Sequence, residues 1–180
     1  MSQQFSQSTR NRMAYQDTPL QLLPGSLGQL LKFAEGGYLY AILDACDAPL
    51  VQKLVQELGT TRAISLFAGI PEAQHWTVSP CLVQADPALL RWVVESLWTQ
   101  PWGVFVMSRA QLPELFEHFR RFLVTELPDG RRFFFRYYDP RVLKQFLSQC
   151  QPEHVHEFFG PVRAFAINQN DDISFFMLNS

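Results

Sequence analysis

Ser108, His118 and Asp139 are of the three residue types that form hydrolytic triads, in which a base activates a hydroxyl nucleophile. A triad is defined by geometry and not by order along the chain, so these residue types alone do not make one. Structural roles explain two of them better. Ser108 ends an apolar run and suits a strand end or a cap, and Asp139 precedes Pro140, a typical helix start.

Asp44 also ends an apolar run, at residues 38–43, which predicts a strand. The carboxyl ends of strands are where open α/β sheets place ligands, although Asp is also a common turn residue. A strand-end site near Asp44, Ser108 and Asp139 is therefore the alternative hypothesis, as a small α/β enzyme or a ligand-sensing module. Such a site would show a concave pocket with convergent polar groups and displaced pKa values.

The sequence contains few motifs that would indicate metal or cofactor binding. His154 and His156 are two residues apart, so on a helix they would point in different directions. No glycine-rich phosphate loop, dinucleotide fingerprint or Gly-x-Ser-x-Gly elbow occurs. Cys46, Cys81 and Cys150 are odd in number and widely spaced, which is typical of reduced thiols in a cytosolic protein. We expect no metal, no cofactor and no catalytic residue.

Arg136 lies among the aromatic residues of segment 131–138, whose Phe and Tyr residues are predicted to form the core of a central strand. An unpaired charge in a buried sheet is costly, so Arg136 should pair with a carboxylate, for which Asp44 and Asp139 are the candidates. The other interpretation is a basic, aromatic groove that receives an acidic or extended peptide. Within this segment and its flank, Arg136 and Arg141 are the residues to test for partner contact.

Hydrophobic periodicity and helix-start signals place the elements that must position these residues. Predicted helices cover 27–35 after a Ser26 cap, 49–58, a segment from Asp86-Pro87 to 98, 112–123, 140–150 and 153–159. Predicted strands cover 38–43, 64–67, 81–83, 103–107, 124–127, 131–138, 162–167 and 173–178. At the fourth helix, Ser108 and Gln111 resemble a capping box, whereas Pro113 favours a start nearer Leu112.

The alternation of strands and helices, followed by local strand pairing, predicts one α/β domain with a mixed, mostly buried sheet flanked by helices. It should span residues 19–180, after a flexible polar tail at residues 1–18. The 180 residues suit one domain, and 47% apolar against 18% charged residues excludes global disorder. A net charge of −2 does not suit a nucleic-acid-binding face, and no signal peptide or membrane span is apparent.

Seven segments in a joint order carry a resemblance to a known family. They are Tyr40-Ala41-Ile42-Leu43-Asp44, Ser65-Leu66-Phe67, Ser79-Pro80-Cys81-Leu82-Val83, Trp102-Gly103-Val104-Phe105 with Ser108, His118-Phe119-Arg120-Arg121-Phe122, Phe135-Arg136-Tyr137-Tyr138-Asp139-Pro140-Arg141-Val142-Leu143 and Phe159-Gly160-Pro161. Together they resemble the type VI secretion effector adaptor family, often called effector chaperones, over residues 38–163.

The resemblance implies a non-catalytic adaptor in the bacterial cytoplasm. Such a protein binds a cognate toxic effector and promotes its loading onto the tip of the spike protein (VgrG), without nucleic acid and without membrane insertion. The family-motif or interface candidates are Asp44, Phe67, Trp102, Ser108, His118, Arg120, Arg136, Tyr138, Asp139 and Arg141. Many family members continue into a further lobe beyond the Gly-Pro segment, so that lobe's role is not carried over.

An adaptor needs an exposed apolar surface, and interface hot spots favour aromatic residues and Arg. Further candidate anchors are the aromatic residues Tyr15, Phe33, Trp76, Trp98 and Trp102. The predicted last strand, at residues 173–178, is expected to be an edge strand that could pair with a strand of the client.

Overall fold

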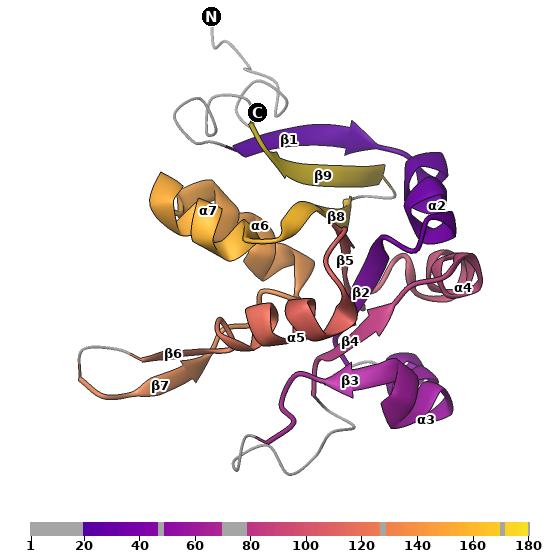
Figure 1. Ribbon diagram of the computed structural model, residues 1–180, viewed down its shortest axis with the longest axis horizontal. Coiled ribbons are helices and arrows are strands. Elements are labelled where there is room, and N and C mark those ends of the chain that lie inside the picture. Colours follow the sequence, from indigo (N-terminus) through magenta and orange to yellow (C-terminus); the bar gives the residue numbers. More distant parts are fainter. Residues whose placement is uncertain (1–19, 47–48, 70–78, 127–128, 170–171, 180) are drawn as a thin grey trace, which may run out of the picture.

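A seven-stranded sheet organises the chain (Figure 1). The computed structural model describes residues 20–46, 49–69, 79–126, 129–169 and 172–179. The strands of this sheet are β1 (Leu20–Gly25), β2 (Leu39–Leu43), β3 (Ala63–Ser65), β4 (Cys81–Gln84), β5 (Gly103–Ser108), β8 (Val162–Gln169) and β9 (Asp172–Leu178). Their order is β1-β9-β8-β5-β2-β4-β3, with β5 in the middle. The predicted tail at residues 1–18 lies outside the described residues.

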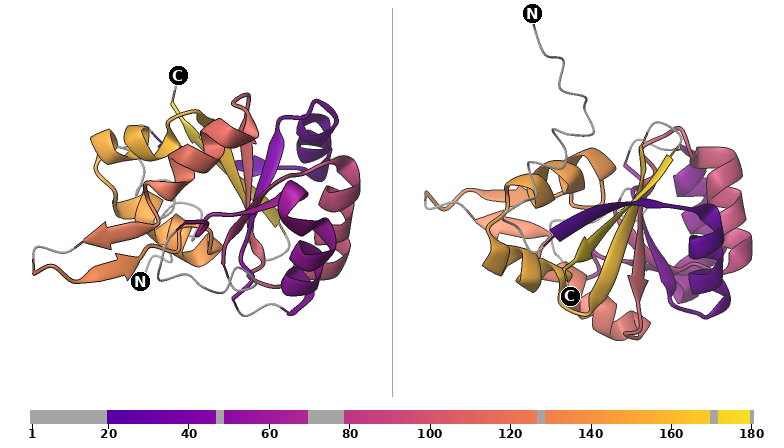
Figure 2. Two further views of the ribbon diagram at one scale, coloured as in Figure 1. Left: turned by 60° about the horizontal axis from the view of Figure 1, so that its bottom comes forward. Right: turned by 90° about the horizontal axis from the view of Figure 1, so that it is seen from above.

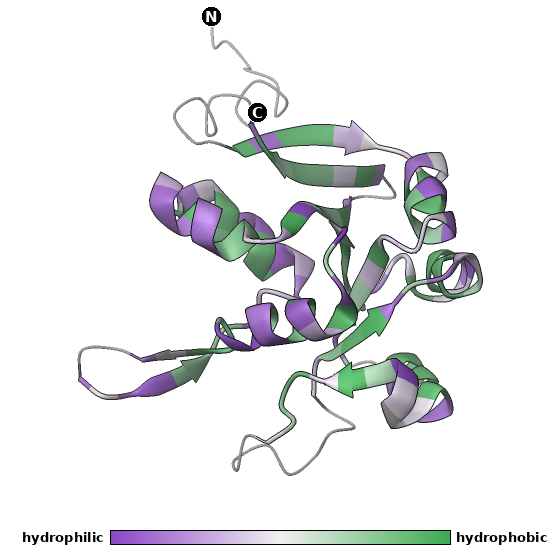
Figure 3. Cartoon of the chain, viewed as in Figure 1, coloured by the Kyte–Doolittle hydropathy of each residue, from purple (hydrophilic) through white to green (hydrophobic). Residues whose placement is uncertain are grey.

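Helices cover both faces of this sheet (Figure 2). On one face lie α2 (Leu27–Glu35), α3 (Pro49–Arg62) and α4 (Pro87–Leu97), and on the other α5 (Leu112–Arg120), α6 (Pro140–Gln149) and α7 (Pro152–Phe159). The strand side chains alternate between the two cores: Ala41 and Leu43 face the first, Tyr40 and Ile42 the second. The strands of this sheet are accordingly mostly in the apolar colour, whereas the helices show both polar and apolar colours (Figure 3).

The predicted α/β domain with a mostly buried sheet and flanking helices is confirmed. Every residue of β2 and β5 is buried, as expected for continuous apolar runs covered on both sides. The described pairs of neighbouring strands in this sheet are all antiparallel, whereas a mixed sheet would also hold parallel pairs. None of the described helices has both the length and the apolar character needed to cross a bilayer.

Local capping signals set several helix starts as predicted. Ser26 and Gln29 form a reciprocal capping box on α2, and the Asp86 carboxylate accepts from the Leu89 N–H at 2.7 Å at the start of α4. Asp139 caps α6 by accepting from the Arg141 N–H at 2.8 Å. At α5, the suggested capping box is absent. Gln111 occupies the cap position without a side-chain bond, and the helix begins at Leu112.

The aromatic segment 131–138 does not form a central strand, so this prediction is wrong. Only Arg132–Phe134 is a strand (β7), and it pairs with β6 (Val124–Glu126) in a separate two-stranded sheet. The chain then turns, so that Tyr137 and Tyr138 enter the second core and Asp139 can cap α6. A continuous apolar run does not show where a strand ends and a turn begins. Here the strand ends early because the chain must turn before the helix that starts at Asp139-Pro140.

The edges of the seven-stranded sheet also differ from expectation. Residues 173–178 fall within β9, which lies between β1 and β8, so β9 is not an edge strand. The edges are β1 and β3. β1 was not predicted, because its partner β9 lies at the other end of the described chain and no local pattern announces the pairing.

Candidate functional site

Antiparallel pairing separates two residues of the predicted strand-end site. β2 and β5 run in opposite directions, with Leu39 opposite Met107 and Leu43 opposite Gly103. Asp44 therefore lies beside Trp102, where its N–H donates to the Trp102 carbonyl at 2.8 Å. Ser108 lies at the other end of β5, where its N–H donates to the Tyr38 carbonyl at 3.0 Å. Asp44, Ser108 and Asp139 thus do not form one site.

An ion pair marks the Asp44 end of the sheet. The Arg136 Nη2 donates to the Asp44 Oδ2 at 2.6 Å, and the Cys46 N–H donates to the Asp44 Oδ1 at 3.1 Å. Of the two predicted candidates for pairing with Arg136, Asp44 and Asp139, the structure pairs it with Asp44. The Asp44 side chain is only 5% exposed, whereas Arg136 retains 38% exposure, and the hydrogen bond to Asp44 raises the pKa of Arg136. The guanidinium also lies 6.0 Å from the centre of the Tyr138 ring.

The aromatic residues of this end are core residues. Burial raises the pKa values of Tyr137 and Tyr138, so both phenols remain neutral. The Tyr137 hydroxyl donates to the Phe119 carbonyl at 2.9 Å. Trp102 is fully buried, with its ring centre 4.7 Å from that of Phe105. The prediction that Trp102 is an exposed anchor is therefore wrong.

Asp139 combines a helix cap with an ion pair. Its carboxylate accepts from the Arg141 Nε at 3.0 Å and from the Arg141 Nη2 at 2.6 Å, in addition to the backbone bond. Burial by itself would raise the pKa of Asp139, but the hydrogen bonds and charge of Arg141 hold that pKa below its ordinary value. Asp139 is thus a charged cap, while 75% of the Arg141 side chain stays exposed.

At the other end of the sheet, Ser108 and His118 hold the turn that leads from α7 into β8. The Ser108 hydroxyl donates to the Pro161 carbonyl at 2.7 Å, and the His118 Nε2 contacts the Phe158 carbonyl at 2.9 Å. A carbonyl only accepts, so Nε2 carries the proton, and the His118 Nδ1 accepts from Arg121 at 2.9 Å. Burial lowers the pKa of His118, which keeps the ring neutral.

Gly160 explains why this turn can approach His118 so closely. Its φ of 47° lies in the left-handed region, and an added Cβ would overlap the His118 ring. Within the described chain, no hydrogen bond joins Ser108, His118 and Asp139 to one another; each contacts other groups instead. The polar residues of the family motif therefore hold turns and helix ends.

The remaining candidates, Phe67 and Arg120, do not join either group. Phe67 is half-buried, and its ring centre lies 5.0 Å from that of Phe134 in β7. The Arg120 guanidinium lies 5.1 Å from the centre of the Phe116 ring. Phe33 and Trp98 are half-buried beside the first core, whereas Tyr15 and Trp76 lie outside the described residues.

Other features offer little for chemistry. A small apolar pocket lies between α2 and α4, on the opposite side of the sheet from the α5, α6 and α7 layer, and is lined by Leu27, Leu31, Pro87, Leu90, Arg91, Val94 and Glu95. Burial raises the pKa of the Cys81 thiol to about 11, so this thiol is not activated. Among the residues that the structure places, no group of three or more His, Cys, Asp or Glu could hold a metal ion.

Phe133 and Phe134 were predicted to be core residues, but both are exposed. Their exposed fractions are 46% and 50%, the largest for aromatic side chains in the described chain. The signal that could have found them is the Asp129-Gly130 turn, since hairpins built on such turns often have a solvent-facing side. The following Arg136 also shows that the aromatic run cannot continue unbroken through a core.

Fold and site together define an α/β sandwich whose prominent polar residues are bonded within the chain. The family model described as "Domain of unknown function (DUF4123)" matches residues 39–157, and this chain belongs to that family. The matched region contains all ten candidate residues and ends before β8 and β9. Comparisons with curated proteins and with solved structures give no match.

Proposed function

We propose that this protein is a non-catalytic adaptor of type VI secretion. It binds a cognate toxic effector in the bacterial cytoplasm and promotes the loading of that effector onto the tip of the spike protein. Membership of the DUF4123 family is consistent with this role, and the resemblance of the motif segments to effector adaptors supplies its content.

One contrast in the structure carries the proposal. The buried polar residues Asp44, Ser108, His118 and Asp139 all bond to groups of this chain, as scaffold residues do. Large apolar side chains, in contrast, reach solvent at several places. An enzyme site needs polar groups that converge on open space, whereas a binding protein needs a stable scaffold and exposed apolar contacts.

The strand-end enzyme or sensor is less well supported. It required Asp44, Ser108 and Asp139 to converge, but Asp44 and Ser108 occupy opposite ends of the central strands. The small pocket between α2 and α4 is lined mostly by apolar side chains, and none of these three residues lines it.

Co-purification tests the adaptor function. The tagged protein is co-expressed with the effector and spike proteins encoded beside its own gene, and with an effector from an unrelated cluster as the control. We expect it to retain the neighbouring effector, to retain the spike protein when that effector is present, and to ignore the unrelated effector. Retention of neither neighbouring product contradicts the proposal.

A further inference from the structure

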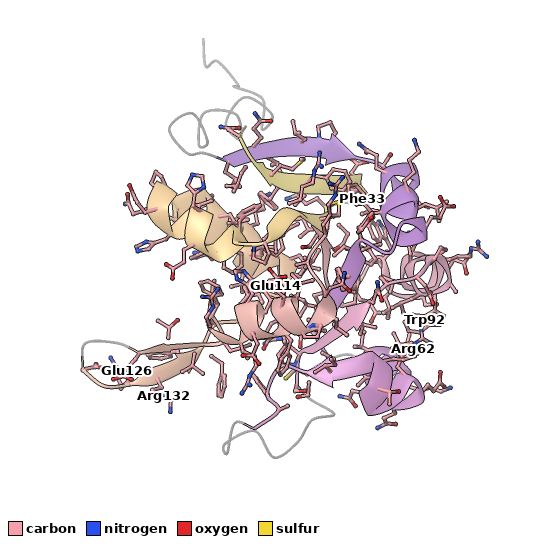
Figure 4. All side chains as sticks on the ribbon, in the orientation of Figure 1. Phe33, Arg62, Trp92, Glu114, Glu126 and Arg132 are labelled. Carbon is pink, nitrogen blue, oxygen red and sulfur yellow. The ribbon has the colours of Figure 1, made fainter. Side chains whose placement is uncertain are left out.

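We propose that the β6–β7 hairpin is the surface on which this adaptor docks an extended, acidic segment of its client, an inference that rests on the proposed function. The hairpin projects away from the helical layers and the main sheet (Figures 1 and 2). Glu126 and Arg132, one on each strand, both lie on this arm, away from the body of the molecule (Figure 4).

Exposed aromatic rings occupy both faces of this hairpin. In the register, Phe134 lies opposite Val124 and Phe133 opposite Thr125, so the two rings point to opposite sides. The Phe134 ring packs against Phe67, yet half of Phe134 remains exposed. Phe133 is exposed to nearly the same extent. Apolar area that the chain itself leaves in water can be buried by a partner.

The backbone of the hairpin is also suited to binding an extended chain. β6 and β7 each have one neighbour among the described strands, so each has an outer edge to which no described strand is paired. A two-stranded sheet is marginally stable by itself, and a third strand would stabilise it. A client segment added at an edge would gain backbone hydrogen bonds and place alternate side chains over Phe133 or Phe134.

Charge indicates which kind of segment fits. Between residues 120 and 136 there are five Arg against only Glu126 and Asp129. Arg136 pairs with Asp44, and the other four Arg leave a surplus of two positive charges in a chain whose net charge is −2. Arg131 pairs with Asp129 at 2.7 Å, but both side chains are more than half exposed, and such pairs are weak enough to exchange partners. An acidic client segment therefore complements this region.

A single-stranded nucleic acid is the competing occupant, because Arg and aromatic residues also bind its phosphates and bases. The rest of the chain argues against it. Outside residues 120–136 the sequence has 10 Lys and Arg against 15 Asp and Glu, counted from totals of 15 and 17. This surplus of carboxylates opposes a long polyanion that extends beyond the hairpin more than a short acidic segment confined to it. The observations thus favour a protein segment.

Paired variants of the adaptor test the docking surface against the co-purified neighbouring effector. Phe133→Thr with Phe134→Thr removes both rings and keeps residues that favour strands. The matched control is Leu27→Ala with Leu50→Ala, which alters two side chains of similar exposure, 45% and 44%, on the opposite face of the sheet. We expect the hairpin variant to bind the effector about tenfold more weakly or worse, and the control to bind within about twofold of the wild type.

A charge-reversal pair provides the second arm. Arg131→Glu with Arg132→Glu should weaken effector binding by a similar factor, whereas Arg91→Glu with Arg163→Glu, elsewhere on the surface, should not. Circular dichroism and thermal melting confirm that each variant is folded. If the aromatic variant does not fold, the charge pair decides, because its residues are exposed.

The outcomes separate the two proposals. Full binding by both hairpin variants overturns the docking surface and leaves the adaptor function standing. A wild-type protein that retains no effector overturns both. If the wild type binds a fluorescent oligothymidine and the Arg131→Glu, Arg132→Glu variant loses only that binding, the occupant is nucleic acid and the peptide assignment is wrong.

Discussion

At the scale of single residues, the Arg136 side chain pairs with a buried carboxylate while remaining partly exposed to solvent. Its Nη2 contacts a carboxylate that is almost fully buried, while more than a third of the Arg136 side chain is exposed. Among the residues that the structure describes, the Asp44 carboxylate otherwise accepts a hydrogen bond only from the Cys46 N–H. The Arg131–Asp129 pair has the same chemistry but lies on the exposed hairpin. Burial of the carboxylate should therefore decide what each pair contributes to stability.

We predict that Arg136→Ala lowers the free energy of unfolding by about 2–4 kcal/mol, because it leaves the Asp44 carboxylate buried without its counter-charge. This loss of stability is at or below the loss expected for a fully buried ion pair, because water can enter the space left by the Arg136 side chain. Arg131→Ala should change the free energy by less than about 0.5 kcal/mol. Urea unfolding followed by fluorescence measures both. Equal stability of the two variants would show that Asp44 finds adequate solvation without Arg136.

At the scale of elements, sequence reasoning succeeded where the determinant is local. Ser26, Asp86 and Asp139 were each predicted to start a helix and do so, because a cap acts on backbone groups two or three residues away. Arg136 was predicted to pair with either Asp44 or Asp139, and it pairs with Asp44.

The failures were of another kind. The aromatic run 131–138 contains the right residue types for a central strand, but the fold splits it into an exposed strand, a turn and a helix cap. The separation of Asp44 from Ser108 depends on strand direction, which no local pattern encodes. The position of β9 depends on β1, whose pairing spans the described chain. Long-range strand pairing therefore determines both where Asp44 and Ser108 lie and which strands form the edges of the seven-stranded sheet.

Gly103 offers a test of the packing between the two central strands. Its φ is 142°, and an added Cβ would overlap the backbone carbonyl oxygen of Ile42 in β2. We predict that Gly103→Ala lowers the free energy of unfolding by about 3 kcal/mol or more, because neither strand can move away within a covered sheet.

Gly28, in the exposed first turn of α2, is the matched control. An added Cβ there meets nothing closer than the Ser26 hydroxyl, at 4.0 Å, so Gly28→Ala should be neutral or stabilise the protein by up to about 1 kcal/mol. Chemical denaturation of both variants gives the comparison. A Gly103→Ala protein as stable as the wild type would mean that β2 and β5 are less tightly held than their geometry indicates.

At the scale of the whole molecule, one sheet separates two cores. Val93 on α4 belongs to the first core and Val155 on α7 to the second, and both are fully buried. Residues on opposite faces of a sheet contact the same strands but not each other. They should therefore contribute to stability independently, while the domain still unfolds as one unit.

We predict that Val93→Ala and Val155→Ala each lower the free energy of unfolding by about 2 kcal/mol, from lost burial and the cavity left behind. The double variant should lose the sum of the two within about 0.5 kcal/mol, in a single transition. Guanidinium unfolding monitored by both fluorescence and circular dichroism measures this. Two separate transitions would show that the layers fold as separate units.

The pairing of β1 with β9 has a consequence for the synthesis of this protein. Leu20 lies opposite Leu178, so the first described strand to leave the ribosome must wait for the last. Chains grow at about 5–20 residues per second, and during this interval the Leu-rich β1 segment has no strand to join. The nascent chain therefore exposes the apolar β1 segment without its partner strand for most of its elongation. We therefore expect the nascent chain to be a substrate for ribosome-associated chaperones.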